Sequence, residues 1–200
     1  MKGSTQQRDV KSALLDATDR LLSRNGYKKM TIDDLAAEVG IGKGSVYLHF
    51  SSKEDIALSH IDRIIERLKT RLAEIAARPT SCERRLKDML IERVLFRFDS
   101  VQHYTQSLND LLSKIRPSLL ERRKRYFEEE ARMFAAIVKQ GIEAGEFAKV
   151  NVKETARSLL LATNSLLPYS LSAQELGERR EIQKRVSALA ELVVHGLTAK

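Results

Sequence analysis

The sequence has few of the residues that break or cross-link a chain. Its 200 residues include nine glycines, three prolines, one cysteine and no tryptophan. The single thiol of Cys82 excludes the disulfide framework that holds small secreted domains together. Because Leu, Ala, Glu, Lys and Arg are abundant while glycine and proline are scarce, the composition favours long helices over sheet. The sequence therefore predicts an all-α fold.

Long apolar runs are also missing. No segment approaches the roughly 20 apolar residues that a membrane-spanning helix needs, and the first ten residues, MKGSTQQRDV, lack the apolar segment of a signal peptide. A hydrophobic content of 42% is nevertheless enough for a substantial core. We therefore expect a cytoplasmic protein.

Motifs for catalysis and metal binding are absent. The four histidines, His49, His60, His103 and His195, are dispersed, and no HExxH, CxxC, GxSxG or phosphate-loop pattern occurs. We expect no enzyme activity, cofactor or metal site. A distant alternative is a helical enzyme whose catalytic groups are far apart in the sequence and come together only when the chain folds. Cys82, near a predicted helix start, could have a lowered pKa and sense oxidants, but an inert or uninvolved thiol is favoured.

The net charge of +8 suggests an anionic partner, but its distribution does not locate the binding surface. Residues 1–60 contain nine Lys or Arg and eight Asp or Glu, a net charge of +1, so +7 belongs to residues 61–200. The local pattern says more, because no acidic residue lies between Val39 and Ser52. This acid-free interval contains Lys43 and His49, and Lys53 follows it, which indicates contact with nucleic acid.

Residues 31–55, TIDDLAAEVGIGKGSVYLHFSSKED, predict two short helices joined by a tight turn. Thr31 can cap the first helix, with Asp34 completing a shortened capping box. Gly40 lets the backbone take a positive φ and turn sharply, after which residues 43–50 can form a second helix across the first. This arrangement is a helix-turn-helix, whose second helix can reach phosphates and base edges.

Over this stretch the chain resembles the tetracycline-repressor-like (TetR) family of bacterial transcription regulators. The resemblance rests on an ordered set of residues with uninterrupted spacing: Gly26, Tyr27, Thr31, Ile32, Leu35, Ala36, Gly40, Ile41, Lys43, Gly44, Ser45, Tyr47, His49, Phe50, Ser52, Lys53 and Glu54. It implies a homodimeric repressor that binds a pseudo-palindromic double-stranded DNA operator and is released by a small-molecule effector. A constitutive DNA-binding regulator without an effector is the alternative.

The resemblance also implies which residues contact DNA. The second helix would enter the major groove, with its first residues nearest the base edges and its later ones on phosphates. The implied contacts are Thr31, Lys43, Gly44, Ser45, Tyr47, His49 and Lys53. Gly42 departs from the serine that many relatives use to cap this helix, and a glycine cap costs a few tenths of a kcal/mol. We therefore expect operator affinity to fall below that of such relatives.

Apolar residues at helical spacing predict about nine helices. They cover approximately residues 10–25, 31–40, 43–50, 52–78, 86–98, 108–116, 117–144, 152–167 and 177–197, with breaks at Gly26, Pro79, Pro117 and Pro168. We expect a helix-turn-helix domain of residues 1–52, joined by the long fourth helix to a helical effector-binding and dimerisation domain of residues 53–200.

Two further sites follow from the resemblance. A largely apolar effector would bind among the fourth to eighth helices, near Phe96, Phe98, Tyr104, Leu112, Tyr126, Phe134, Asn164 and Tyr169. The last two helices would pack against their copies in a second subunit, through Leu159, Thr163, Leu166, Ile182, Val186, Leu189 and Val193. Aromatic residues at helical spacing usually belong to an ordinary core, whereas Asn164 needs a polar partner inside an apolar helix. That partner could be ligand, backbone or the other subunit.

Overall fold

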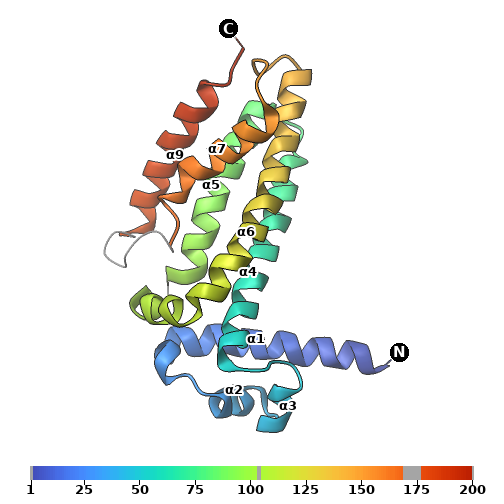
Figure 1. Ribbon diagram of the computed structural model, residues 1–200, viewed down its shortest axis with the longest axis vertical. Coiled ribbons are helices and arrows are strands. Elements are labelled where there is room, and N and C mark those ends of the chain that lie inside the picture. The colour runs from blue at the N-terminus through green and yellow to red at the C-terminus, as the bar shows by residue number, and fades with distance from the viewer. Residues whose placement is uncertain (1, 103–104, 169–176, 200) are drawn as a thin grey trace. The chain divides into compact units, whose positions relative to one another are not determined.

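The computed structural model describes residues 2–102, 105–168 and 177–199, without the side chains of 2–8, 105–109 and 112. These ranges are helical, with no β-strand beyond an isolated bridge between Phe147 and Thr198, so the all-α prediction is confirmed (Figure 1). The helices are α1 (Lys2–Lys29), α2 (Ile32–Val39), α3 (Lys43–Tyr47), α4 (Lys53–Ala76), α5 (Cys82–Val101), α6 (Thr105–Glu143), α7 (Val152–Asn164) and α9 (Arg179–His195). None of them is both long and apolar enough to span a membrane.

One compact unit comprises Met1–Ile64 and Gln102–Leu120. In it α1 packs against α2, and α2 against α3, around a core that includes Leu14, Leu35 and Val46. The predicted stop at Gly26 is an interruption within α1, where φ is 71° and ψ is 167°. The first helix was predicted to begin near residue 10, but α1 already begins at Lys2.

The other compact unit comprises Ile65–Val101 and Glu121–Lys200. Here α5 packs against both α7 and α9, which also contact each other (Figure 1). The side chains that fill its core include Leu68, Leu86, Phe134, Leu160 and Val194. This unit therefore has a hydrophobic core of its own. The functional division at residue 52 stays a prediction.

The predicted break at Pro117 is wrong, because α6 runs through this residue without interruption. Proline lacks an N–H and its ring crowds the carbonyl four residues earlier, which costs about 3 kcal/mol in a helix interior. Leu111, Ile115 and Leu119 follow one another at four-residue spacing and are all buried. Pro117 lies within this stripe in the sequence but is itself exposed. A continuous helix therefore keeps these three apolar side chains in the core.

Candidate nucleic-acid interface

The start of α2 is fixed by the capping box predicted from the sequence. The Thr31 hydroxyl accepts a hydrogen bond from the Asp34 backbone N–H at 3.1 Å and donates to the Asp34 carboxylate at 2.7 Å. The same carboxylate accepts from the Thr31 N–H at 2.9 Å. These hydrogen bonds from the Thr31 side chain and backbone lower the pKa of Asp34. The capping box is confirmed, and it engages the hydroxyl that was predicted to contact a phosphate.

The turn between α2 and α3 also follows the sequence prediction. Gly40 has φ 75° and ψ 32°, the left-handed conformation that glycine adopts without a steric penalty. The Gly40 N–H bonds to the Ala37 carbonyl at 3.2 Å, and the Ile41 N–H bonds to the Ala36 carbonyl at 3.0 Å. Gly42 precedes α3 without a side-chain cap. The turn therefore brings α3 across α2 at a fixed position.

The two sides of α3 differ sharply in exposure. Val46 and Phe50 are buried against the core of the unit. Tyr47 is 51% exposed and Leu48 is 78% exposed. The buried side orients the helix, so that Gly44, Tyr47 and Leu48 remain accessible to a partner. The exposure of Leu48 was not foreseen from the sequence.

Lys43 at the start of α3 pairs with an acidic residue of α2. Its ammonium donates a hydrogen bond to the Asp33 carboxylate at 2.8 Å, and both side chains are more than half exposed. This hydrogen bond raises the pKa of Lys43. Because an exposed ion pair is weak, Lys43 can exchange Asp33 for a phosphate or a guanine. Asp33 was not singled out in the sequence.

Lys53 lies at the first position of α4 and is half-buried. Its ammonium is 4.3 Å from the centroid of the Tyr27 ring and 3.4 Å from the Lys28 carbonyl oxygen. Burial lowers the pKa of Lys53, with Glu54 opposing the shift. The Tyr27 hydroxyl donates to Glu54 at 3.3 Å, and burial together with Glu54 raises the pKa of Tyr27 to about 12. These contacts join the start of α4 to the end of α1.

The residues predicted to contact DNA all belong to the first compact unit. Four are exposed: Thr31, Lys43, Gly44 and Tyr47. Three are half-buried: Ser45, His49 and Lys53. Their contacts with DNA stay predictions, and the structure shows that none of the seven is enclosed in the core.

The residues predicted to line an effector site are in different environments. Phe96 and Asn164 are half-buried, whereas Phe98, Tyr126 and Phe134 are buried. Tyr104, Tyr169 and the side chain of Leu112 lie outside the part of the chain that the structure describes. Their roles in ligand binding stay predictions.

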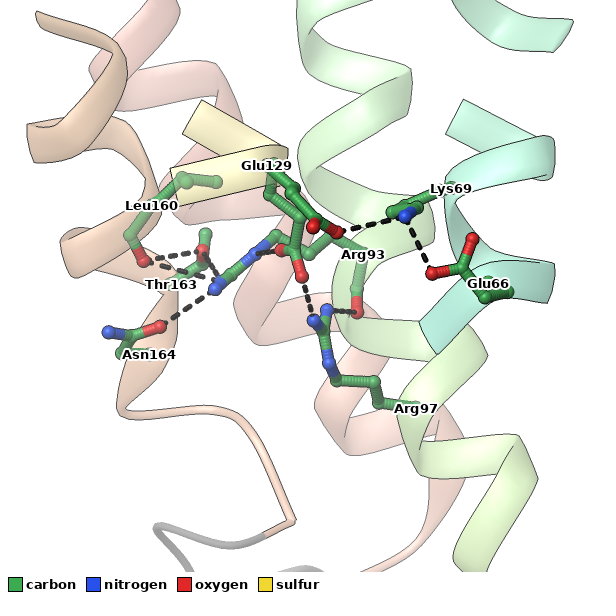
Figure 2. A network of polar contacts seen from close by, with 9 residues as sticks. Glu66, Lys69, Arg93, Arg97, Glu129, Leu160, Thr163 and Asn164 are labelled. Carbon is green, nitrogen blue, oxygen red and sulfur yellow. Dashed lines mark hydrogen bonds and ion pairs between the residues drawn. The ribbon is translucent and has the colours of Figure 1, made fainter. Parts of the chain in front are cut away.

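A buried network of charged side chains gives Asn164 a polar partner (Figure 2). Arg93 on α5 donates from Nε to Glu130 on α6 at 2.7 Å, and from its terminal nitrogens to the Thr163 hydroxyl at 2.6 Å and the Asn164 amide oxygen at 2.8 Å. Arg97, one turn further along α5, pairs with the second oxygen of Glu130. The partner of Asn164 is thus an arginine of the same chain, which the sequence reasoning did not consider.

The residues predicted for the dimer interface divide into two groups. Leu159, Thr163, Ile182 and Val186 are buried within the chain itself. The other three, Leu166, Leu189 and Val193, are partly exposed. The large apolar side chains most exposed on α7 and α9 are Leu161, at 60%, and Leu192, at 71%, and neither was predicted.

Cys82 is buried at the start of α5. Burial raises the pKa of its thiol, and the nearby Glu146 adds to the shift, although Arg85 donates a hydrogen bond to Sγ at 3.0 Å and opposes it. A raised pKa means little thiolate at neutral pH, so the structure favours the inert thiol over the oxidant sensor. Among the side chains that the structure describes, no three His, Cys, Asp or Glu residues gather as metal ligands.

The arrangement of α2, the Gly40 turn and the half-exposed α3 defines a helix-turn-helix DNA-binding protein. Comparison with known families gives the same class. The model for bacterial regulatory proteins of the tetR family matches residues 14–59, and the model for the tetracyclin repressor-like C-terminal domain matches residues 118–193. The chain belongs to the TetR family of transcription regulators.

Individual relatives agree with this assignment. The fatty acid metabolism regulator protein of Bacillus subtilis (strain 168) is 24% identical over 203 residues, covering 98% of this chain and 99% of the relative. The HTH-type transcriptional regulator YerO of the same organism is 27% identical over 110 residues, covering 53% of this chain but only 36% of YerO. A transcriptional regulator from Cytophaga hutchinsonii ATCC 33406 has the same fold, with a TM-score of 0.78, 21% identity and coverage of 93% of this chain and 97% of the other.

Proposed function

We propose that this chain is a homodimeric repressor, that its two helix-turn-helix motifs bind a pseudo-palindromic operator, and that a small-molecule effector releases it. The observation that carries this proposal is the accessible side of α3, which is free of acidic residues and held in place by the buried Val46 and Phe50. In a symmetric dimer the two copies of α3 would enter successive major grooves, with half-site centres about 34–36 Å apart or somewhat more.

Dimerisation through α7 and α9 is supported by the apolar side chains that these helices leave in solvent. Leu161 and Leu192 are more than half exposed, and α7 contacts α9 within the subunit. Burying such a leucine fully would contribute about 1.5–3 kcal/mol. The partly exposed Leu166, Leu189 and Val193 would extend the apolar surface. A second copy of the chain would cover these residues in a four-helix bundle.

A metabolite is a suitable effector class, because a relative that matches 98% of this chain is a fatty acid metabolism regulator. Phe96 and Asn164 are the predicted lining residues that remain partly exposed, so they offer an apolar and a polar contact to a ligand. The effector would have to bind the form that is unable to bind DNA more tightly than the form that binds it, because equal affinity would shift neither population.

A regulator that works without an effector is the second candidate. It is favoured by Phe98, Tyr126 and Phe134, which were predicted to line the effector site but are buried as core residues. The two candidates differ in one measurable respect. Only the ligand-responsive repressor is released from its operator by a compound of low molecular weight.

A mobility-shift experiment tests operator binding. The duplex spans the region upstream of the chain's own coding sequence, and the wild type is compared with Tyr47→Ala and Lys53→Ala. Lys139→Ala is the matched control, because Lys139 is 70% exposed on α6 and pairs with its helical neighbour Glu143. We expect both test variants to weaken binding and the control to leave it unchanged. Equal binding by all four proteins would contradict the assigned residue roles.

Effector release is tested with the same duplex. Small molecules extracted from the purified protein by denaturation are identified by mass spectrometry and then titrated into the protein–DNA complex. Release of the duplex by an extracted compound would support the repressor with an effector. A protein that carries no compound, and that a metabolite panel does not release, would support the constitutive regulator.

A further inference from the structure

The strip of α3 directly opposite the buried Val46 carries no polar side chain. An α-helix turns by about 100° per residue, so residues 44 and 48 lie roughly opposite the buried Val46. Gly44 has no side chain, and nothing lies within 4 Å of the place where a Cβ would stand. Leu48 is 78% exposed, and its φ of −70° and ψ of −20° continue the helical backbone. The outermost strip of α3 therefore consists of a bare backbone followed by a leucine.

The polar residues of α3 lie beside this strip. Lys43 is paired with Asp33 on α2, and Ser45 is half-buried. Tyr47 is half-exposed on one flank. None of these side chains occupies the positions directly opposite Val46. The part of α3 that would penetrate deepest into a groove thus offers apolar surface in place of hydrogen-bond donors or acceptors.

We infer that Leu48 is a specificity-determining residue that contacts the C5-methyl group of a thymine in the operator. The methyl group of thymine is the only apolar group that base edges present in the major groove, and apolar side chains select it by burying it. The inference rests on operator binding by α3. Gly44 supports it, because a position without a side chain allows the helix to approach the bases closely enough for Leu48 to reach a methyl group.

Charge complementarity identifies DNA as the partner that covers Leu48. The interval from Gly40 to Ser51 contains no acidic residue, and Lys43 and Lys53 are basic residues close to α3. An exposed leucine is common on protein surfaces and by itself indicates nothing. Here, however, it is the C-cap of α3, the helix that the turn at Gly40 presents to solvent, and lies between Tyr47 and His49. The surrounding chemistry fits a polyanion better than an apolar protein surface.

Replacing thymine by deoxyuridine removes only the methyl group, so it provides a direct test. The operator is first obtained by selecting duplexes from a random library with the full chain. Each thymine is then replaced by deoxyuridine, symmetrically in both half-sites, and affinities are measured for the wild type, Leu48→Ala and Leu120→Ala. Leu120 is the matched control because it is an exposed leucine on α6. Unchanged melting temperatures establish that the variants are folded.

We expect the wild type to lose affinity when one particular thymine is replaced. Losing contact with one buried methyl group corresponds to about fourfold, and losing it in both half-sites to about 15-fold. Leu48→Ala should bind the thymine operator more weakly and should no longer distinguish thymine from deoxyuridine at that position. Leu120→Ala should behave as the wild type does.

Three results would overturn the inference: selected half-sites without thymine, a wild type indifferent to every replacement, or discrimination that persists in Leu48→Ala. Each of these leaves operator binding intact, because it requires that a duplex was selected. Failure to select any duplex is a different result, which would contradict the proposed function and the role of Leu48 together.

Discussion

The ion network of Glu130 allows a quantitative prediction about stability. Its carboxylate accepts a hydrogen bond from Arg93 Nε at 2.7 Å and pairs through its other oxygen with Arg97 (Figure 2). All three residues are at least 94% buried. Glu130→Ala would leave two guanidinium ions in the core without a carboxylate. Removing one partner of a buried ion pair typically costs about 3–5 kcal/mol of unfolding free energy.

This cost translates into a large change in melting temperature. For a chain of this length, 1 kcal/mol corresponds to about 2–4 °C, so Glu130→Ala should melt about 6–20 °C below the wild type. The assay is thermal unfolding followed by circular dichroism at neutral pH. Glu129→Ala is the control, because Glu129 is the adjacent residue on α6 and pairs with the partly exposed Lys69. The control should melt within a few degrees of the wild type.

Lowering the pH should reduce the difference between the wild type and Glu130→Ala. Burial alone would raise the pKa of Glu130, but the charges of Arg97 and Arg93 outweigh it, so the pKa is lowered. A carboxyl group with a lowered pKa in the folded state stabilises the protein above its unfolded pKa of about 4.3, and this contribution is lost as the pH falls through the folded pKa. A Glu130→Ala protein that melts with the wild type, or a difference that persists unchanged down to pH 2, would refute the reasoning.

Three other substitutions test separate parts of the structure. Thr31→Ala removes the α2 cap and should cost about 1 kcal/mol, measured by urea unfolding; a loss within error would contradict the capping role. Gly141→Ala places a Cβ against the buried Phe147 ring, closer than van der Waals contact, so it should cost about 1–3 kcal/mol, and a melting temperature at or above that of the wild type would contradict this packing. Leu192→Glu should convert the proposed dimer to a monomer in sedimentation velocity without lowering its helix content; an unchanged dimer would exclude this residue from the interface.

The fold elements that the sequence predicts well are those set by neighbouring residues. The capping box of Thr31 and Asp34 and the left-handed turn at Gly40 each depend on positions at most five residues apart. Such contacts are encoded locally, so the helix-turn-helix and its approximate limits could be inferred before the structure was known.

Features that depend on distant residues could not be read from the sequence. Pro117 predicts a helix break locally, but the burial of the apolar stripe on both sides of it keeps α6 continuous. Arg93 finds its partners 37 and 70 residues away, in Glu130 and Thr163. Its position beside Val94 and Leu95, with Arg97 four residues on, was a usable signal, because charged residues at helical spacing on an apolar face need partners.

The sequence predicted which residues form the candidate DNA surface, and the structure adds their exposure and their contacts within the chain. Lys43 is exposed and Lys53 is half-buried, and each has an intramolecular partner that sequence spacing does not reveal. Leu48 was overlooked because an apolar residue within a helix is usually assigned to the core. Only the burial of Val46 and Phe50 establishes that Leu48 faces outward.

The most direct test of the central claim is the affinity of the wild-type protein for its upstream duplex, measured by fluorescence anisotropy beside a scrambled duplex of the same composition. The account predicts saturation at two chains per operator, preference for the operator, and a linear fall in log affinity with log salt concentration as phosphate contacts are lost. Tyr47→Ala should reduce the preference. Equal affinity for the two duplexes, or no binding to either at low salt, would contradict operator recognition by α3.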